Sequence, residues 1–197
     1  MVKPRRQHDE LRAEIIAFAE AVIRSEGVGG LNARDLASYA NVSVGTLYNL
    51  FGHLDGVVRA VNIQNMESLK IALMTALSAS EPSLEDRLIA MALAYLAFAK
   101  ADPRRWEAMF HYRLKTPGEP ANLEAKNDLF TLLKETVGAG EDPTVLLALW
   151  AAVHGVAELA VTERMAGMES QDMEGYVRLI VRAGLRGVQA MRASGEM

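Results

Sequence analysis

The 197-residue chain contains no cysteine and only four histidines. The absence of cysteine excludes disulfides, thiolate metal sites and cysteine nucleophiles, and it fits a reducing compartment such as the cytoplasm. The sequence also lacks HExxH, P-loop and GxSxG patterns, so no nucleophile–base pair can be assigned. We therefore expect a protein that is not an enzyme and that carries no metal ion or cofactor.

A long apolar run is also missing. Crossing a membrane takes about 20 apolar residues, and the nearest candidate, residues 145–161, is shorter and includes His154 and Glu158. The N-terminal residues MVKPRRQHDE have no apolar run behind their basic side chains, unlike a secretory signal. We expect a cytoplasmic protein with no membrane partner.

The chain has no overall excess of positive charge, since its formal net charge is −4. Residues 1–59 hold seven Lys/Arg and seven Asp/Glu, whereas residues 60–197 hold fourteen and eighteen. Lys3, Arg5 and Arg6 precede the first acidic residue and form either an arm for the minor groove or phosphates, or a solvated terminus. A neutral front half with a basic tip permits DNA binding without proving it.

Hydrophobic residues make up 50% of the sequence, and their spacing is helical almost throughout. Leu11, Ile15, Phe18 and Val22 recur at the spacing of one helix face and predict a helix over 8–26. Similar patterns predict helices over 33–40, 44–51, 55–79, 84 to the break at 102, 103–114, 121–137, 142–165 and 169–193. We find no convincing strand, so the sequence predicts an all-α fold of about nine helices.

The stretch ANVSVGTLYNLF, residues 40–51, is rich in β-branched and aromatic residues but has no partner strand. It fits the turn and second helix of a helix-turn-helix. Asn41 is one of the few non-glycine residues that readily adopt a positive φ in such a turn, and Ser43 is a good helix N-cap. With Leu47 and Phe51 buried on one face, the N-terminal end of this helix is free to enter the major groove.

The outward residues of this helix are the candidates for DNA contact. Thr46 can bond a base edge or offer its methyl group to thymine, Gly45 allows close approach of the backbone, and Tyr48 suits a phosphate. Arg34 is either a DNA contact or a solvated charge. The predicted DNA-binding residues are Asn32, Arg34, Ser43, Val44, Gly45, Thr46, Tyr48 and Asn49, together with Arg5 and Arg6.

Residues 31–61, LNARDLASYANVSVGTLYNLFGHLDGVVRAV, resemble the DNA-binding segment of the TetR/AcrR family of repressors. The stretch LWAAVHGVAEL, residues 149–159, is similar to a Trp–His–Gly signature in the eighth helix of one subgroup. The resemblance implies a homodimer with an N-terminal three-helix helix-turn-helix domain, residues 1–53. It also implies a C-terminal helical bundle for ligand binding and dimerisation, residues 54–197.

The sequence departs from the family pattern at several positions. Asn32 replaces a threonine cap, Asn41 replaces a glycine, and Leu54 stands where the family commonly has a phosphate-binding lysine. Asn49 and Leu50 replace frequent polar or basic residues. Fewer phosphate contacts predict a shallow dependence of DNA affinity on salt.

The apolar segment 145–161 needs cover on more than one side. Together with the glycines of the last helix it predicts a four-helix dimer interface, with a plain monomer core as the alternative. The predicted interface residues are Val153, Val156, Ala157, Gly184, Leu185, Gly187 and Val188. His154 and Glu158 have the i,i+4 spacing of metal ligands, but no third ligand is evident.

Aromatic residues and methionines gather in the middle helices, where they line an effector cavity or fill the core. The predicted ligand-binding residues are Met91, Tyr95, Trp106, Met109, Phe110, Arg113, Trp150 and His154. Such a cavity favours an apolar ligand, with Arg113 and His111 as the nearest polar anchors.

The leading hypothesis is a ligand-responsive transcriptional regulator, a repressor that binds a pseudo-palindromic double-stranded DNA operator as a dimer. A small, largely apolar effector would release it. An all-α enzyme and an all-α ligand-binding or interaction protein without DNA binding are the alternatives.

Overall fold

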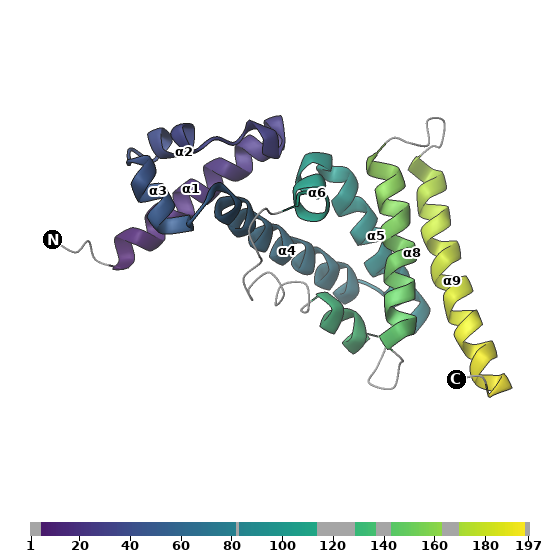
Figure 1. Cartoon of the computed structure of the whole chain (residues 1–197). Coiled ribbons are helices and arrows are strands. Elements are labelled where there is room, and N and C mark those ends of the chain that lie inside the picture. Colours follow the sequence, from purple (N-terminus) through teal and green to yellow (C-terminus); the bar gives the residue numbers. More distant parts are fainter. Residues whose placement is uncertain (1–4, 82, 114–128, 137–142, 163–169, 196–197) are drawn as a thin grey trace. The chain divides into compact units, whose positions relative to one another are not determined.

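The computed structural model describes residues 5–81, 83–113, 129–136, 143–162 and 170–195. These residues form helices and no strand, which confirms the all-α prediction (Figure 1). The elements are α1 Arg5–Glu26, the 3-10 turn η1 Val28–Gly30, α2 Ala33–Tyr39, α3 Val44–Phe51, α4 Leu54–Ser78, α5 Leu84–Ala101, α6 Pro103–Phe110, α8 Pro143–Val161 and α9 Ser170–Ser194. Residues 129–136 are helical as well.

The predicted C-terminal end of α6 differs from the observed one. This helix ends at Phe110 rather than at residue 114. The backbone N–H groups of His111 and Tyr112 both donate to the carbonyl of Glu107, at 2.8 and 3.0 Å, and this shared acceptor closes the last turn. The predicted loop 115–120 and the first part of the predicted helix 121–137 lie outside the described residues.

The chain packs as two compact units. The first comprises the described residues of Met1–Glu67 and Arg104–Ala125, and the second those of Ser68–Pro103 and Lys126–Met197. Helix α4 therefore contributes its first half to one unit and its second half to the other. The functional boundary expected between residues 53 and 54 stays a prediction.

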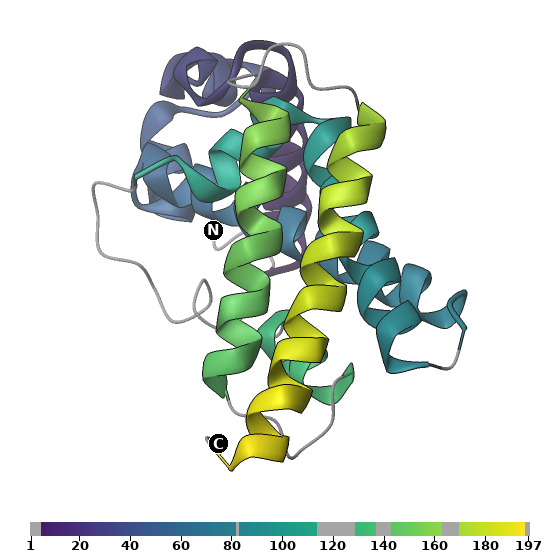
Figure 2. The same cartoon turned by 90° about the vertical axis from the view of Figure 1, so that its right-hand side faces the viewer.

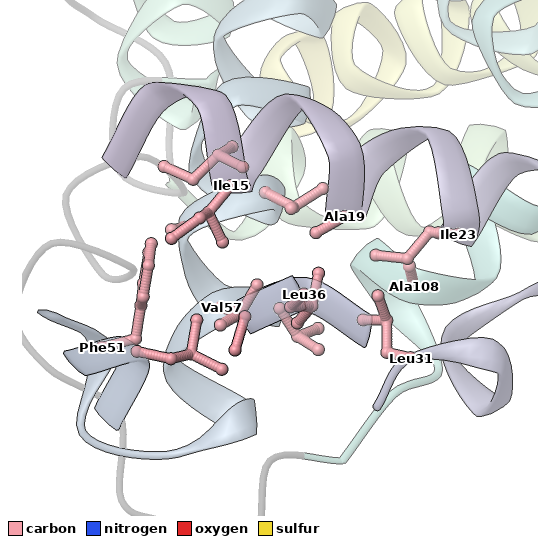
Figure 3. Close-up of a cluster of buried hydrophobic side chains, with 14 residues drawn as sticks. Ile15, Ala19, Ile23, Leu31, Leu36, Phe51, Val57 and Ala108 are labelled. Carbon is pink, nitrogen blue, oxygen red and sulfur yellow. The ribbon is translucent and has the colours of Figure 1, made fainter. Parts of the chain in front are cut away.

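A single apolar cluster holds the first unit together (Figure 3). Ile15, Ala19 and Ile23 line one face of α1 at helical spacing and are fully buried. They meet side chains from α2, α3 and the start of α4, and Ala108 of α6 joins the same cluster. Burying a side chain of the size of isoleucine, such as Ile15 or Ile23, stabilises the fold by about 1.5–3 kcal/mol. Helix α6 thus belongs to the core of the helix-turn-helix unit.

The second unit is built mainly from α5, α8 and α9, each of which packs against the other two. Helices α8 and α9 run side by side and antiparallel (Figures 1 and 2). At the exposed surface of this bundle, an ion pair links α5 to α9. Its atoms, Glu85 Oε1 and Arg182 Nε, are 2.8 Å apart.

Candidate nucleic-acid interface

The N-terminus of α3 is capped by Ser43, as predicted. Its Oγ accepts the backbone N–H of Thr46 at 3.0 Å. The hydroxyl groups of Ser43 and Thr46 also lie 2.9 Å apart, within hydrogen-bond distance. The cap therefore fixes the tip of the helix and positions the hydroxyl of Thr46, one of the side chains expected to contact DNA.

The turn before α3 uses the backbone conformation predicted for Asn41, whose φ is 51°. No other non-glycine residue in the described ranges has a positive φ. The backbone N–H of Val42 donates to the carbonyl of Ala37 at 2.9 Å, which ties the turn back to α2. The angle between the two helices of the motif is held by this short, hydrogen-bonded connection.

The two faces of α3 differ as the sequence predicts. Leu47 and Phe51 are buried in the cluster, with exposed fractions of 0% and 8%. Tyr48 keeps 43% of its surface exposed, and Gly45 and Asn49 are exposed too. Val44 and Thr46 are half-buried at the helix tip. The helix is therefore anchored from behind and presents a mixed polar and aromatic face to solvent.

Arg12 contacts the C-terminal end of α3, and this contact was not predicted from the sequence. Its Nη1 donates to the carbonyl of Leu50 at 2.6 Å, and its guanidinium lies 4.5 Å from the centre of the Phe51 ring. A cation at a helix C-terminus and over an aromatic face is stabilising on both counts. The two partners are 38 residues apart in sequence, so no local pattern could reveal this contact.

An open groove of about 610 Å³ lies between the N-termini of α2 and α3, lined by Asn32, Ala33, Arg34, Asp35, Val44 and Tyr48. It brings together four of the predicted DNA-binding residues. Asn32 caps α2 as predicted, since its Oδ1 accepts the backbone N–H of Asp35 at 2.9 Å, and its amide N–H donates to the Asp35 carboxylate. Arg34 is exposed at the rim and carries the positive charge of the groove.

The basic tip of the chain remains a prediction. Arg5 and Arg6 are the first two residues of α1. Lys3 and the side chains of both arginines lie outside the described residues.

The connection from α3 to α4 leaves no room for a larger residue at Gly56. A Cβ there would lie 1.9 Å from the carbonyl oxygen of Phe51. Leu54, at the start of α4, packs against the apolar cluster. The side chain that stands in place of a phosphate-binding lysine is thus part of the core of the helix-turn-helix unit.

Three side-chain hydrogen bonds fasten α6 and its C-terminal extension to the helix-turn-helix unit. Asn62 Nδ2 donates to the carbonyl of Ala108 at 2.6 Å, and the Tyr112 hydroxyl donates to Asp55 Oδ1 at 2.9 Å. Arg104 Nη1 donates to the carbonyl of Arg24 at 3.4 Å. Burial, and then the bond to Asp55 and its negative charge, raise the pKa of Tyr112. No local pattern in the sequence indicated these long-range contacts.

The predicted ligand-binding residues divide between the two units. Trp106 and Met109 are buried in the first unit, where the rings of Trp106 and Phe110 lie 4.4 Å apart, and Arg113 is exposed. In the second unit, Met91 and Tyr95 are buried, and Tyr95 meets His154. Trp150 stacks on His154 but is 38% exposed. Their role in ligand binding stays a prediction.

Several predicted dimer residues are buried within the single chain, namely Val153, Val156, Ala157 and Val188. Gly184 and Gly187 are exposed, and Leu185 is half-buried. The large apolar side chains that face solvent on these helices are Leu147, Trp150 and Leu159 of α8 and Tyr176, Leu179 and Met191 of α9.

Helix α8 is strongly apolar, although little of it is buried within the chain. In the described part of the chain, its residues Thr144–Val161 form the one segment that is long and apolar enough to cross a membrane, with a mean hydropathy of 1.8. Only 22% of this segment is buried. A metal site is not found in this part of the chain, where no three His, Asp or Glu side chains are grouped to hold an ion.

Comparison with known proteins finds a family match for the C-terminal part of the chain. Residues 88–184 match the family described as tetracyclin repressor-like, C-terminal domain. No curated protein matches the chain. A structure of a protein of unknown function from Rhodococcus sp. RHA1 is 27% identical, with a TM-score of 0.75 and coverage of 90% of this chain and 94% of the other.

Two further structures share the fold at lower identity. A TetR transcriptional regulator from Rhodococcus sp. RHA1 is 16% identical with a TM-score of 0.67, covering 91% of this chain and 97% of the other. A TetR-like transcriptional regulator from the same organism is 18% identical with a TM-score of 0.60, covering 94% and 100%. The chain therefore shares its all-α fold with these regulators, and its residues 88–184 are similar to the C-terminal domain of tetracyclin repressor-like proteins.

Proposed function

We propose that the protein is a cytoplasmic, ligand-responsive repressor that binds a pseudo-palindromic operator as a homodimer. The observation that carries the proposal is the tip of α3. It is capped by Ser43, anchored through Leu47 and Phe51, and free to present Tyr48 and Asn49 to a DNA groove. Two such helices related by a two-fold axis would read half-sites about one helical turn apart.

Dimerisation is supported by the uncovered apolar side of α8 and α9. Leu147, Leu159 and Leu179 are 40–61% exposed on two neighbouring antiparallel helices. Large apolar side chains left exposed on neighbouring helices are typical of an interaction surface. A second copy of the same face would cover it in a four-helix arrangement, which an apolar helix with so little cover requires.

Effector binding is proposed for the bundle, and a small, largely apolar molecule fits its composition. Buried side chains of the bundle such as Met91 and Tyr95 offer apolar contacts. Helix α4 belongs to both compact units, so it is the natural element to transmit a change from the bundle to α3. The effector can weaken DNA binding only by as much as its affinity differs between the two states.

The DNA assignment is tested by mobility shift on the DNA upstream of the protein's own gene. We expect Tyr48→Ala and Thr46→Ala each to weaken binding at least tenfold, because a good polar contact contributes about 1–3 kcal/mol. Tyr39→Ala is the matched control, since Tyr39 is 53% exposed on α2 but stacks on Phe18, outside the groove. Unchanged affinity in folded Tyr48→Ala and Thr46→Ala variants would refute the assignment.

The dimer is tested by sedimentation at micromolar concentration. Leu179→Glu places a charge in the proposed interface, where it would be desolvated, so we expect a monomer. Gln189→Glu adds the same charge on the side of α9 that carries Arg178 and Arg182, and we expect it to stay dimeric. A Leu179→Glu protein that remains a dimer would exclude this interface.

A further inference from the structure

A polar and aromatic array joins α5 to α8 inside the second unit. The hydroxyl of Tyr95, on α5, lies 2.9 Å from Nδ1 of His154, on α8. The indole of Trp150, one turn earlier on α8, stacks on the His154 ring with centroids 4.9 Å apart and planes at 16°. Tyr95 is buried, His154 is half-buried and Trp150 is 38% exposed, so the array runs from the buried side of α8 to its surface.

One proton arrangement satisfies the donors and acceptors of this array. The indole N–H of Trp150 can only donate, and its bond to the Tyr95 phenol lowers the pKa of that phenol, against the larger rise caused by burial. The Tyr95 O–H then donates to Nδ1 of His154, which must be unprotonated to accept. The proton of a neutral His154 therefore sits on Nε2, which faces Glu158 Oε1 at 3.5 Å.

A doubly protonated His154 would break this arrangement. Its Nδ1–H would donate to the phenol oxygen, so the Tyr95 O–H would have to turn from His154 to another acceptor. In the described part of the chain, the titratable groups that face the His154 ring include the phenol of Tyr95 from α5 and the carboxylate of Glu158 from α8. With the proton on Nε2, the imidazole accepts from Tyr95 at Nδ1 and presents its N–H to Glu158, so both ring nitrogens have partners.

We propose that Tyr95, Trp150 and His154 form a polar clasp that fixes the rotation of α8 about its own axis and so decides which apolar residues of α8 face a second copy of the chain. The clasp is needed because α8 is apolar almost all round, with Thr144, His154 and Glu158 as its polar residues. Hydrophobic burial is non-directional and would accept several rotations of such a helix. A hydrogen bond to a buried phenol is directional, so it is compatible with only one of these rotations.

The rotation matters because neighbouring residues of a helix lie 100° apart. In the observed setting, Val153, Val156 and Ala157 are buried, whereas Leu147 and Leu159 face solvent. A shift of one residue position would bury part of the outer apolar side and expose part of the inner one. The three side chains are thus positioning residues for the interface, a role that rests on the dimer proposed above.

The proton arrangement is read directly by ¹⁵N NMR of the histidine side chains in the full-length protein. We expect His154, assigned by the signal lost in His154→Gln, to be protonated on Nε2 at neutral pH. In Tyr95→Phe, which removes only the hydroxyl, we expect this preference to disappear. Tyr39→Phe, which removes the exposed hydroxyl of α2, should leave it unchanged.

The effect on the interface is measured as the dimer dissociation constant. We expect Tyr95→Phe to weaken the dimer about five- to tenfold, as the loss of one hydrogen bond implies, and Tyr39→Phe to leave it within twofold. His154→Asn keeps an acceptor atom near the position of Nδ1, so it should retain more affinity than His154→Leu. Higher dimer affinity in His154→Asn than in His154→Leu would separate positioning from general packing, because leucine fills the site but cannot accept a hydrogen bond.

The outcomes separate the clasp from the dimer itself. Protonation of His154 on Nδ1, or a Tyr95→Phe protein that dimerises as tightly as the wild type, would overturn the clasp while leaving the dimer in place. A wild-type protein that is monomeric at micromolar concentration would overturn the proposed dimer instead, and with it the role of the clasp at the interface.

Discussion

At the scale of single residues, Gly56 is the position with the least room. A Cβ there would lie 1.9 Å from the Phe51 carbonyl oxygen, which is backbone and cannot swing away. We expect Gly56→Ala to lower the free energy of unfolding by about 2 kcal/mol or more. This loss lies within or above the usual range for overpacked sites. Urea denaturation measures this change.

The control for Gly56→Ala is Gly175→Ala, a change at a helical glycine of α9 with no atom within 4 Å of the added Cβ. Alanine there should stabilise the protein by about 0.5–1 kcal/mol, because it restricts the unfolded chain and favours the helix. Equal effects of the two substitutions would contradict the close approach at Gly56.

Tyr95 gives the protein a predicted sensitivity to alkaline pH. Burial raises the pKa of its phenol well above the ordinary 10.0; the bond from Trp150 lowers it and the charge of Glu158 raises it further. Above pH 10 the unfolded chain releases this proton before the folded chain does, so the folded state holds more protons and the free energy of unfolding falls as pH rises. Below pH 10 this contribution is constant.

The test is the pH dependence of urea denaturation between about pH 9 and 11, on both sides of the ordinary tyrosine pKa. We expect Tyr95→Phe to lose less stability over this range than the wild type, because it has no phenol to ionise. Tyr39→Phe, at an exposed position, should follow the wild type. A Tyr95→Phe protein that follows the wild-type curve would mean that the phenol is not buried as observed.

At the scale of helices, two serine caps make a matched pair. Ser43 caps α3 and Ser83 caps α5, each with Oγ accepting the N–H three residues on, at 3.0 and 3.1 Å. We expect Ser43→Ala and Ser83→Ala each to cost about 1 kcal/mol of stability. Only Ser43→Ala should also weaken DNA binding, because Ser43 positions Thr46. Equal DNA affinity in the two variants would show that the α3 cap serves stability alone.

The caps also show what sequence reasoning can reach. Asn32, Asn41 and Ser43 were predictable because each acts on its own neighbours: a side chain caps the next turn, or a residue tolerates a positive φ. The burial of Leu47 and Phe51 followed from helical spacing in the same way. Local chemistry and periodicity were thus enough to predict the all-α fold and the orientation of α3.

The contacts that escaped prediction join residues far apart in sequence. Arg12 reaches Leu50 across 38 positions, and Asn62 reaches Ala108 across 46. Nothing near Ala108 indicates that α6 packs in the core of the helix-turn-helix unit, because its short apolar face would serve equally well in a bundle. The side of α8 that is buried was not predictable either, because apolar residues surround that helix and their pattern selects no face.

For the whole molecule, the distribution of charge predicts how DNA binding responds to salt. Residues 1–59 have no net charge. In the groove between α2 and α3, Arg34 is accompanied by Asp35, and the position of a phosphate-binding lysine is taken by Leu54, which packs in the core. Each phosphate that a cation neutralises adds about −0.9 to the slope of log affinity against log salt. Few cations therefore mean a shallow slope.

We expect a slope smaller in magnitude than about 4 for the dimer on its operator, measured by fluorescence anisotropy over a salt series. Arg34→Gln should reduce the magnitude by about 2, one contact for each protomer. Arg178→Gln, which removes an exposed charge of α9, should leave it unchanged. A slope near −10 would require about ten neutralised phosphates. The neutral helix-turn-helix unit could make so many phosphate contacts only through cations outside the groove. The basic tip at Lys3, Arg5 and Arg6 would be the first candidate.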